Sequence, residues 1–301
     1  MQMFAAATAG CVETLLPDDV GACPSQKQLS MAIDEMKAKQ LDNITCEPRF
    51  KAVLNSVKLP GTGAFLNSIP SPALGLRMTS DVFSTALKYR LGSPIFPKDG
   101  DCGMCGKASD MMGDHAISAC SGNGDKSRRH NLVRDALFQA ASAASLAPRR
   151  EERGLISGRD ARPGDITING WSRSGGKPKT AFDVTVASPL AQNCIRRTTI
   201  GESKFVFENA INRKVTTYQK MNLPPDIDFI PLPVTTFGAW EENALANIIE
   251  IAAHQAHNTG KEKAGIKKHL LQKLSVCLQR ENAEMLITRR PELPAHVDGV
   301  L

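Results

Sequence analysis

The sequence lacks the features typical of membrane, secreted or disordered proteins. No apolar run approaches the ~20 residues that a membrane helix needs, so we expect no membrane span. The first residues are mildly apolar but lack the charged start of a secretory signal. No internal repeat is present. With 42% hydrophobic and 23% charged residues, the 301-residue chain has the composition of a folded protein of one or two domains.

The cysteines show no disulfide spacing. Of the eight in the chain, five are scattered, namely Cys11, Cys23, Cys46, Cys194 and Cys277. Such a pattern fits a reducing compartment, because disulfide-stapled domains space their cysteines densely. We therefore expect an intracellular, nuclear protein.

The remaining three cysteines lie beside a histidine in the segment DCGMCGKASDMMGDHAISAC. Cys102, Cys105, His115 and Cys120 follow the spacing C-x2-C-x9-H-x4-C. Three thiolates and one imidazole fill a tetrahedral zinc site and leave no position open for water, so the zinc is expected to be structural. The alternative is that three unrelated cysteines and a histidine fall close together.

Positive charge is concentrated in the middle of the chain. The net charge is +6, but residues 126–214 hold 17 Lys/Arg and 8 Asp/Glu, a balance of +9, so the rest sums to −3. A concentrated positive stretch suits a polyanionic partner. DNA is the expected partner, with RNA as an alternative; an ordinary solvated basic surface is the other interpretation.

Hydrophobic periodicity predicts a mixture of helices and strands. A helix is expected over 81–91, capped by Thr79 or Ser80 and stopped by Gly92. The other helices are expected at 26–40, 128–147 and 202–221, with two more between 240 and 281 that break at Asn258–Gly260. Strands are expected at 151–156, 163–168 and 180–187, the last two forming a hairpin, and at 228–237, where prolines favour an edge.

Two acidic residues lie within the expected hairpin. Asp165 in ARPGDITI and Asp183 in TAFDVTVASP are each flanked by strand-forming residues. A lone carboxylate in a strand usually faces solvent, but two on one face of neighbouring strands can share Mg²⁺ or Mn²⁺. Such a cation polarises a phosphate and activates water. Glu151 is a third candidate at the start of the first expected strand, and Glu152 would face the other way.

A lysine lies on an apolar helical stripe. Phe207, Ile211, Lys214 and Tyr218 share one face of the helix at 202–221. The amine of Lys214 would need a carboxylate, a phosphate or water there. Its stem can also snorkel to solvent. Lys204 is the rival for the same role.

Together these landmarks resemble the C-terminal region of non-LTR retrotransposon proteins of the restriction-like endonuclease type. There a zinc knuckle precedes a nuclease core of the PD-(D/E)XK class. The resemblance covers residues 65–240, with CGMC, H and C, then RRHNLVRDALF, RPGDI, FDVTVASP and the Lys214 helix. It implies that Asp165 matches the PD acid after Gly164, and that Asp183 matches the second acid. Thr185 occupies the usual lysine position.

The resemblance also assigns the remaining candidates. Glu151 would be the acid near the first core strand, and Lys214 the catalytic lysine moved onto the following helix. Tyr218 would position Lys214 or a phosphate. The residues expected to contact the nucleic-acid backbone are Arg128, Arg129, His130, Arg134, Arg149, Arg150 and Arg162. No Y/F-x-D-D segment occurs, so the chain has no polymerase site.

We therefore expect an α/β (α+β) protein with a restriction-endonuclease-like mixed sheet flanked by helices. The expected units are a helical appendage (1–64), a helix with the zinc module (65–125), the nuclease core (126–240), C-terminal helices (241–284) and a flexible tail (285–301). The expected function is Mg- or Mn-dependent DNA cleavage by an endonuclease of retrotransposon origin. The alternatives are an inactive nucleic-acid-binding module and a protein-interaction scaffold.

Overall fold

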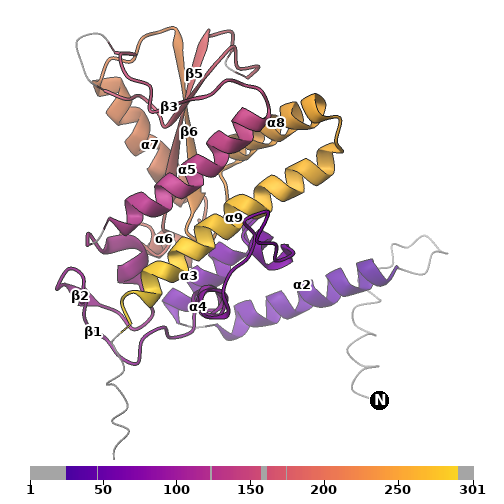
Figure 1. Ribbon diagram of the computed structural model, residues 1–301. Helices are drawn as coiled ribbons and strands as arrows, with labels where there is room; N and C mark the ends of the chain where they lie inside the picture. The colour runs from indigo at the N-terminus through magenta and orange to yellow at the C-terminus, as the bar shows by residue number, and fades with distance from the viewer. Residues whose placement is uncertain (1–24, 46, 123, 157–160, 174, 291–301) are drawn as a thin grey trace, which may run out of the picture.

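The computed structural model describes residues 25–290, apart from positions 46, 123, 157–160 and 174 (Figure 1). Its N-terminal part contains the helices α2 (Gln26–Ile44), α3 (Pro48–Val57) and α4 (Ser80–Arg90), with the 3-10 turn η1 (Ala64–Asn67). Thr79 caps α4 as predicted, since its side chain accepts a hydrogen bond from the Val82 amide. No helix in the described part of the chain is long and apolar enough to cross a membrane.

The centre of the molecule is a four-stranded mixed sheet. Its strands are β3 (Arg149–Arg150), β4 (Ile166–Asn169), β5 (Lys179–Ala187) and β6 (Ile227–Thr235), in the order β3-β4-β5-β6. β4 and β5 form the predicted antiparallel hairpin, and β6 runs parallel to β5. The proline-containing β6 lies at the edge of the sheet, because proline cannot donate to a ladder on both sides.

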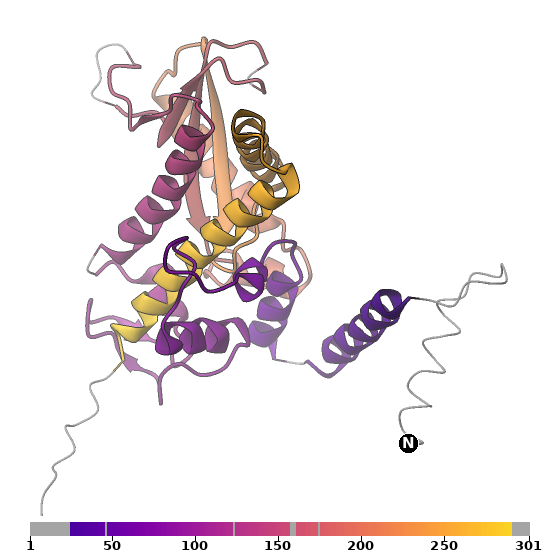
Figure 2. The same ribbon diagram turned by 45° about the vertical axis from the view of Figure 1, so that its right-hand side comes forward.

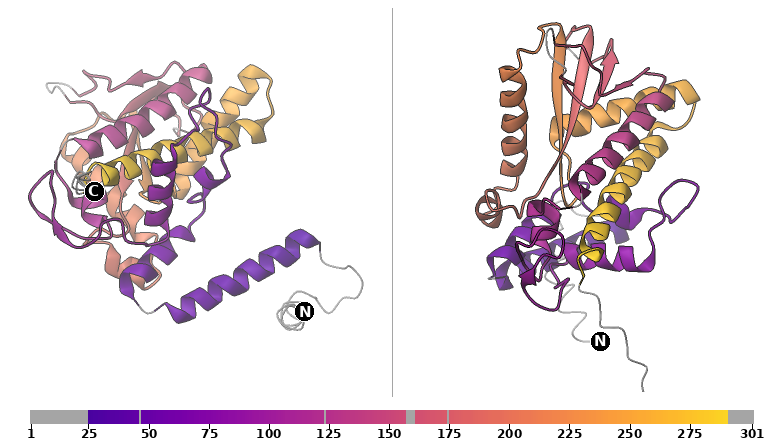
Figure 3. Two further views of the ribbon diagram at one scale, coloured as in Figure 1. Left: turned by 60° about the horizontal axis from the view of Figure 1, so that its bottom comes forward. Right: turned by 60° about the vertical axis from the view of Figure 1, so that its left-hand side comes forward.

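Helices cover both faces of this sheet (Figure 3). On one side lies α7 (Phe205–Lys220), and on the other lie α5 (Asp125–Ala143), α8 (Glu242–Thr259) and α9 (Lys263–Ile287). Phe182 and Val184 of β5 pack into the core formed with α5, α8 and α9. Because side chains alternate along a strand, Asp183 points the other way, where it meets α7. A short helix, α6 (Ile195–Thr199), connects β5 to α7.

The first two predicted strands begin and end differently in the structure. The strand expected at 151–156 is wrong: β3 is only Arg149–Arg150, and Glu151 follows with φ +45°. A left-handed backbone cannot continue an extended ladder, which explains why the strand stops there. The second strand begins at Ile166 instead of 163, since Gly164 turns the chain with φ +86°.

The C-terminal helices belong to the body of the fold. α8 and α9 contribute Ile248, Ile251, Leu274 and other side chains to the core of the sheet, so 241–284 forms no separate unit. The expected tail from 285 is also wrong at its start, because α9 continues to Ile287 and Met285 is fully buried. Residues 291–301 lie outside the described residues.

The expected N-terminal appendage divides into two parts. The long helix α2 has no buried residue and stands away from the body (Figure 2). In contrast, α3 buries Ala52 and Val53 in a core shared with Met285 and Leu286 of α9. The compact body therefore begins near residue 48, and residues 1–24 lie outside the described part.

Candidate functional site

The zinc-ligand candidates converge on one point. Cys102 and Cys105 flank the turn of a small hairpin between β1 (Gly100–Asp101) and β2 (Ala108–Ser109). His115 opens a single π-helical turn, η2 (His115–Ala119), and Cys120 ends it. One ligand atom from each of the four residues lies within 4.8 Å of the others. The predicted set is thus brought together.

The distances in this cluster suit tetrahedral zinc. The Sγ atoms of Cys102 and Cys120 are 3.8 Å apart. Zinc–sulfur bonds of about 2.3 Å at tetrahedral angles place two sulfurs about 3.8 Å apart. Cys105 Sγ lies 3.2 Å from His115 Nε2, slightly closer than the ~3.6 Å of the same geometry. These four residues can hold a zinc ion.

The surroundings of His115 and Cys120 favour the forms of these side chains that bind a metal. Burial lowers the pKa of His115, which keeps the imidazole neutral. Burial alone would raise the pKa of the Cys120 thiol, but hydrogen bonds from Arg289 and the Gly122 amide lower it. Arg289 Nη2 lies 3.2 Å from Cys120 Sγ, and Arg289 Nη1 lies 2.8 Å from Asp125. The end of α9 is thereby tied to the zinc module.

A second cluster forms where β4 begins. Ile166 pairs with Phe182 in the antiparallel register, so Asp165 lies directly opposite Asp183. The amide of Asp165 donates to Phe182 O at 2.7 Å. Beyond this point β5 has no β4 neighbour, and the free Val184 amide donates to Asp165 Oδ2 at 2.7 Å. The backbone therefore fixes the Asp165 carboxylate against β5.

His130 of α5 completes this cluster. Its Nε2 lies 3.0 Å from Asp165 Oδ2, and His130, Asp165 and Asp183 each place one ligand atom within 4.8 Å of the others. The sequence predicts a contact with the nucleic-acid backbone for His130 and does not indicate it as a ligand candidate. No local pattern in the sequence indicates this role, because it arises from the packing of α5 on β5. One imidazole and two carboxylates are a donor set suited to a divalent cation.

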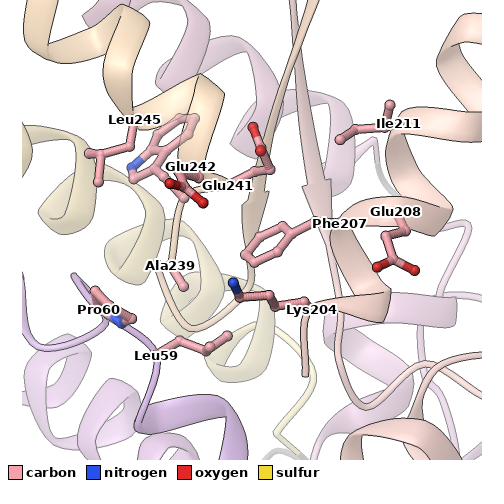
Figure 4. Close-up of a pocket in the computed structure, with 11 residues that line it drawn as sticks. Leu59, Pro60, Lys204, Phe207, Glu208, Ile211, Ala239, Glu241, Glu242 and Leu245 are labelled. Carbon is pink, nitrogen blue, oxygen red and sulfur yellow. The ribbon is translucent and has the colours of Figure 1, made fainter. Parts of the chain in front are cut away.

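Lys214 lies beside the two carboxylates. Its Nζ is 2.8 Å from Asp183 Oδ2, and the Asp183 side chain is only 3% exposed. Lys204, the rival candidate, lies at the N-terminal end of α7 and lines a different cavity, of about 350 Å³, with Phe207 and Leu245 (Figure 4). His130, Asp165 and Asp183 do not line that cavity. The structure thus brings Lys214, and not Lys204, to Asp183.

Tyr218 contacts the turn before Asp165 and the neighbouring strand β6. Its ring lies 4.1 Å from that of Phe229 on β6, and its hydroxyl accepts a hydrogen bond from the Gly164 amide at 3.2 Å. Gly164 is required here, because a Cβ would lie 2.9 Å from Phe182 O. Burial, followed by the charge of Asp183, raises the pKa of Tyr218 to about 12, so the phenol stays neutral. Tyr218 therefore fixes the turn that precedes Asp165.

The acidic pair carries the electrostatic signature of closely spaced carboxylates. Burial, and then the charge of Asp165, raises the pKa of Asp183 to about 6 despite the Lys214 ion pair. For Asp165, burial would raise the pKa, but the hydrogen bond from His130 lowers it. His130 responds in turn: burial opposes its charge, but Asp165 raises its pKa. Asp183 is the carboxyl whose charge lacks full compensation, and a cation would supply it.

Glu151 does not join the cluster. Its carboxylate pairs with Arg134 on one oxygen and Arg162 on the other. Glu152, which strand alternation predicts on the opposite face, forms an ion pair with Lys179, with Oε2 at 2.7 Å from Nζ. Thr185, at the usual lysine position, is buried with no partner for its hydroxyl. The Glu151 carboxylate is therefore not among the converging ligand atoms, although the Glu151 amide donates to Asp165 O at 3.0 Å.

Most of the arginines expected on the nucleic acid are in ion pairs. The carboxylate partners are Asp125 and Glu281 for Arg128, Asp135 and Glu151 for Arg134, Glu152 for Arg149, Asp135 for Arg150 and Glu151 for Arg162. Arg129 differs, since it is buried and has no carboxylate partner among the described residues. The net positive charge of this region is therefore less available than residue counts indicate.

What the arrangement can do follows from these contacts. Two carboxylates and an imidazole face one point, and an ammonium group lies against one of the carboxylates. Such a site can bind a divalent cation and place a positive amine beside a bound anion. Comparison of the chain with protein-family models and with curated proteins found no match.

Proposed function

We propose that this protein is a metal-dependent endonuclease that hydrolyses phosphodiester bonds in DNA. The observation that carries the proposal is the convergence of Asp165, Asp183 and His130 on one point, with Lys214 paired to Asp183. Phosphodiester hydrolysis needs a cation to polarise the phosphate and a positive group at the developing charge. The resemblance to restriction-like endonucleases of retrotransposons supports the same chemistry.

Each residue of the site has a separate role in this proposal. Asp165 and Asp183 hold the cation, with His130 as the third ligand. When bound, Mg²⁺ or Mn²⁺ supplies Lewis-acid stabilisation of the phosphate and lowers the pKa of water. Lys214 stabilises charge on the phosphate, and Tyr218 positions Asp165 through the Gly164 amide. Because an imidazole is a better ligand for Mn²⁺ than for Mg²⁺, we expect faster cleavage with Mn²⁺.

The test is nicking of supercoiled plasmid with and without Mg²⁺ or Mn²⁺, on wild type and two matched lysine variants. Lys214→Gln is expected to slow nicking by about 100-fold or more, because it removes an electrostatic stabiliser from the site. Lys204→Gln is the control and should cut at the wild-type rate. Equal activity of the two variants would remove Lys214 from the mechanism.

The pH dependence of nicking gives an independent check. The pKa of Asp183 is raised to about 6, so this carboxyl is protonated at lower pH and cannot hold a cation. At limiting Mn²⁺, the nicking rate should therefore rise with pH through about 6. Raising the Mn²⁺ concentration should move the midpoint to lower pH, since the cation competes with the proton. A rate independent of pH between 5 and 7 would contradict this role.

A non-catalytic nucleic-acid-binding module is the second candidate. The observation in its favour is Thr185, which leaves the position after Asp183 and Val184 without the usual lysine. Under this alternative the protein binds DNA but leaves it intact in every metal tested. Salt-dependent DNA binding without nicking would select it over the nuclease.

A further inference from the structure

A polar cavity of about 290 Å³ lies between the zinc module and the sheet. Its wall is shared by four elements: η2 supplies Ser118, α5 supplies Lys126 and Arg129, the segment after β5 supplies Ser188, and α7 supplies Asn209 and Arg213. Three of its lining side chains are cations, and none is a carboxylate. The cavity is therefore built for negative charge.

Arg129 is the strongest sign of a missing anion. Its residue is 3% exposed, its Nη1 donates to Ile117 O and to Asn282 Oδ1, and its Nε is buried without an acceptor. Burial lowers the pKa of Arg129 to about 10, because removal from water disfavours the charged guanidinium. Buried charges in folded proteins are usually paired. Here the described residues supply no carboxylate for the pair.

The nearby acids are already engaged. Asp125 pairs with Arg289 and Arg128, and Glu281 pairs with Arg128. The other two cations of the cavity lack acidic partners as well: Lys126 Nζ has only Ser118 O, at 3.5 Å, and no described residue pairs with the Arg213 guanidinium. The three cations of the cavity thus differ from the arginines near β3, which form ion pairs with Asp and Glu.

The cavity adjoins the proposed cation site on both helices that flank it. On α5, Lys126 precedes His130 by four residues, which is about one turn or ~6 Å. On α7, Arg213 directly precedes Lys214, and Asn209 lies one turn earlier. The cavity and the proposed cation site are therefore built from neighbouring turns of the same two helices.

We infer that this cavity is a phosphate-binding pocket formed by Lys126, Arg129 and Arg213, with Ser188 and Asn209 as further hydrogen-bond donors. A phosphate oxygen would give the Arg129 guanidinium its missing acceptor, and arginine forks match phosphate geometry. Resting on the proposed function, the occupant is a backbone phosphate next to the bond that is cut. A free phosphate group, as in a nucleotide, has the same chemistry and is separated from it by the experiment below.

The test compares two charge-matched double variants of the full chain. Lys126→Gln with Arg213→Gln removes two exposed cations of the pocket, and Lys220→Gln with Lys268→Gln removes two exposed cations elsewhere. The buried Arg129 stays unchanged in both variants, and all four replaced side chains are exposed, so both variants are expected to fold. Binding of inorganic phosphate is measured by NMR shifts of backbone amides at constant ionic strength. DNA affinity is measured against salt without divalent cations, so that neither readout depends on cleavage.

Wild type and the Lys220/Lys268 control should show phosphate-dependent shifts at Ser188 and Asn209, and the Lys126/Arg213 variant should lose them. Its DNA affinity should fall at all sequences, with a salt slope smaller by about one to two units. Lost phosphate binding with unchanged DNA affinity would retain the pocket and assign it to a free phosphate group. Equal phosphate binding by all three proteins would overturn the proposal, even if the protein cuts DNA. Failure of nicking with the pocket intact would remove only the nuclease.

Discussion

Replacing Asp183 with asparagine is expected to abolish DNA nicking and, without divalent cations, to raise the thermal stability of the protein. Loss of a residue that only hydrogen-bonds to a metal ligand typically lowers activity by about 10–100-fold. Because Asp183 is a direct ligand in the proposed site, its replacement should lower the nicking rate by more than that. The stability gain has a separate origin. The Asp183 side chain is 3% exposed and carries a charge that its surroundings disfavour.

The pH dependence of this gain follows from linkage. The folded pKa of Asp183, about 6, lies above its ordinary value of 3.8. Folding therefore favours the protonated carboxyl, and the corresponding stability is present below about pH 4 and lost as pH rises through about 6. Asparagine is neutral at every pH. The variant should melt several degrees above wild type at pH 8 in metal-free buffer, with the difference vanishing near pH 4.

Asp226→Asn serves as the matched control, since Asp226 is exposed on the loop before β6. It should nick and melt as wild type does. Adding Mn²⁺ should narrow the gap in melting temperature by stabilising only the proteins that retain Asp183. An Asp183→Asn protein that is destabilised at pH 8 in metal-free buffer would show that Asp183 is an ordinary structural ion-pair partner. In that case the cation site would lose its main electrostatic support.

The sequence was informative wherever the signal was local. The zinc ligands lie within 19 residues, and the C-x2-C turn requires its two thiolates to be neighbours. The hairpin of β4 and β5 was equally readable, because alternation and a glycine-rich loop set its register, and that register alone places Asp165 opposite Asp183. Helical spacing placed Lys214 on the correct face of α7, although it could not separate Lys214 from Lys204.

Most of the wrong predictions depended on packing between distant segments. His130 joins Asp165 only because α5 crosses the sheet at β5, a contact that no local pattern encodes. Glu151 lies outside the site because its carboxylate pairs with Arg134 and Arg162 and because its left-handed backbone ends the strand. α9 buries polar residues such as Gln279 and Asn282, whose amides donate to Thr236 O. Its apolar stripe is thus interrupted, and no periodicity indicates that the helix continues to Ile287.

The charge balance of residues 126–214 does not show which of its cations are free of acidic partners. The +9 balance over 126–214 correctly indicates a basic region, but net charge says nothing about which cations have partners. In the fold, the arginines near β3 are paired with Asp and Glu, whereas Lys126, Arg129 and Arg213 surround a cavity without any acid. Lys126, Arg129 and Arg213, beside the zinc module, are therefore among the cations of this region that can still attract a phosphate.

Removal of zinc is expected to destabilise the whole body of the fold. Structural zinc contributes about 10–16 kcal/mol of apparent binding free energy in zinc-finger peptides. Here the π-helical turn that carries His115 also buries Ile117 against Met285 and Leu286 of α9. Arg289, at the end of the same helix, donates to Cys120 Sγ. Loss of the metal would leave clustered thiols and loosen this junction, lowering the melting temperature by about 10 °C or more.

The measurement is zinc content per chain together with melting curves before and after a strong zinc chelator, with Mg²⁺ restored. Cys105→Ser should melt like the chelated wild type and show no further change with chelator. Cys277→Ser, a half-buried cysteine outside the cluster, should retain zinc and its response to the chelator. A zinc-free wild type that melts at the same temperature would mean that the hydrophobic contacts of Ile117 hold the module alone. Because η2 also walls the phosphate pocket, a real zinc effect should weaken phosphate binding in step with the loss of metal.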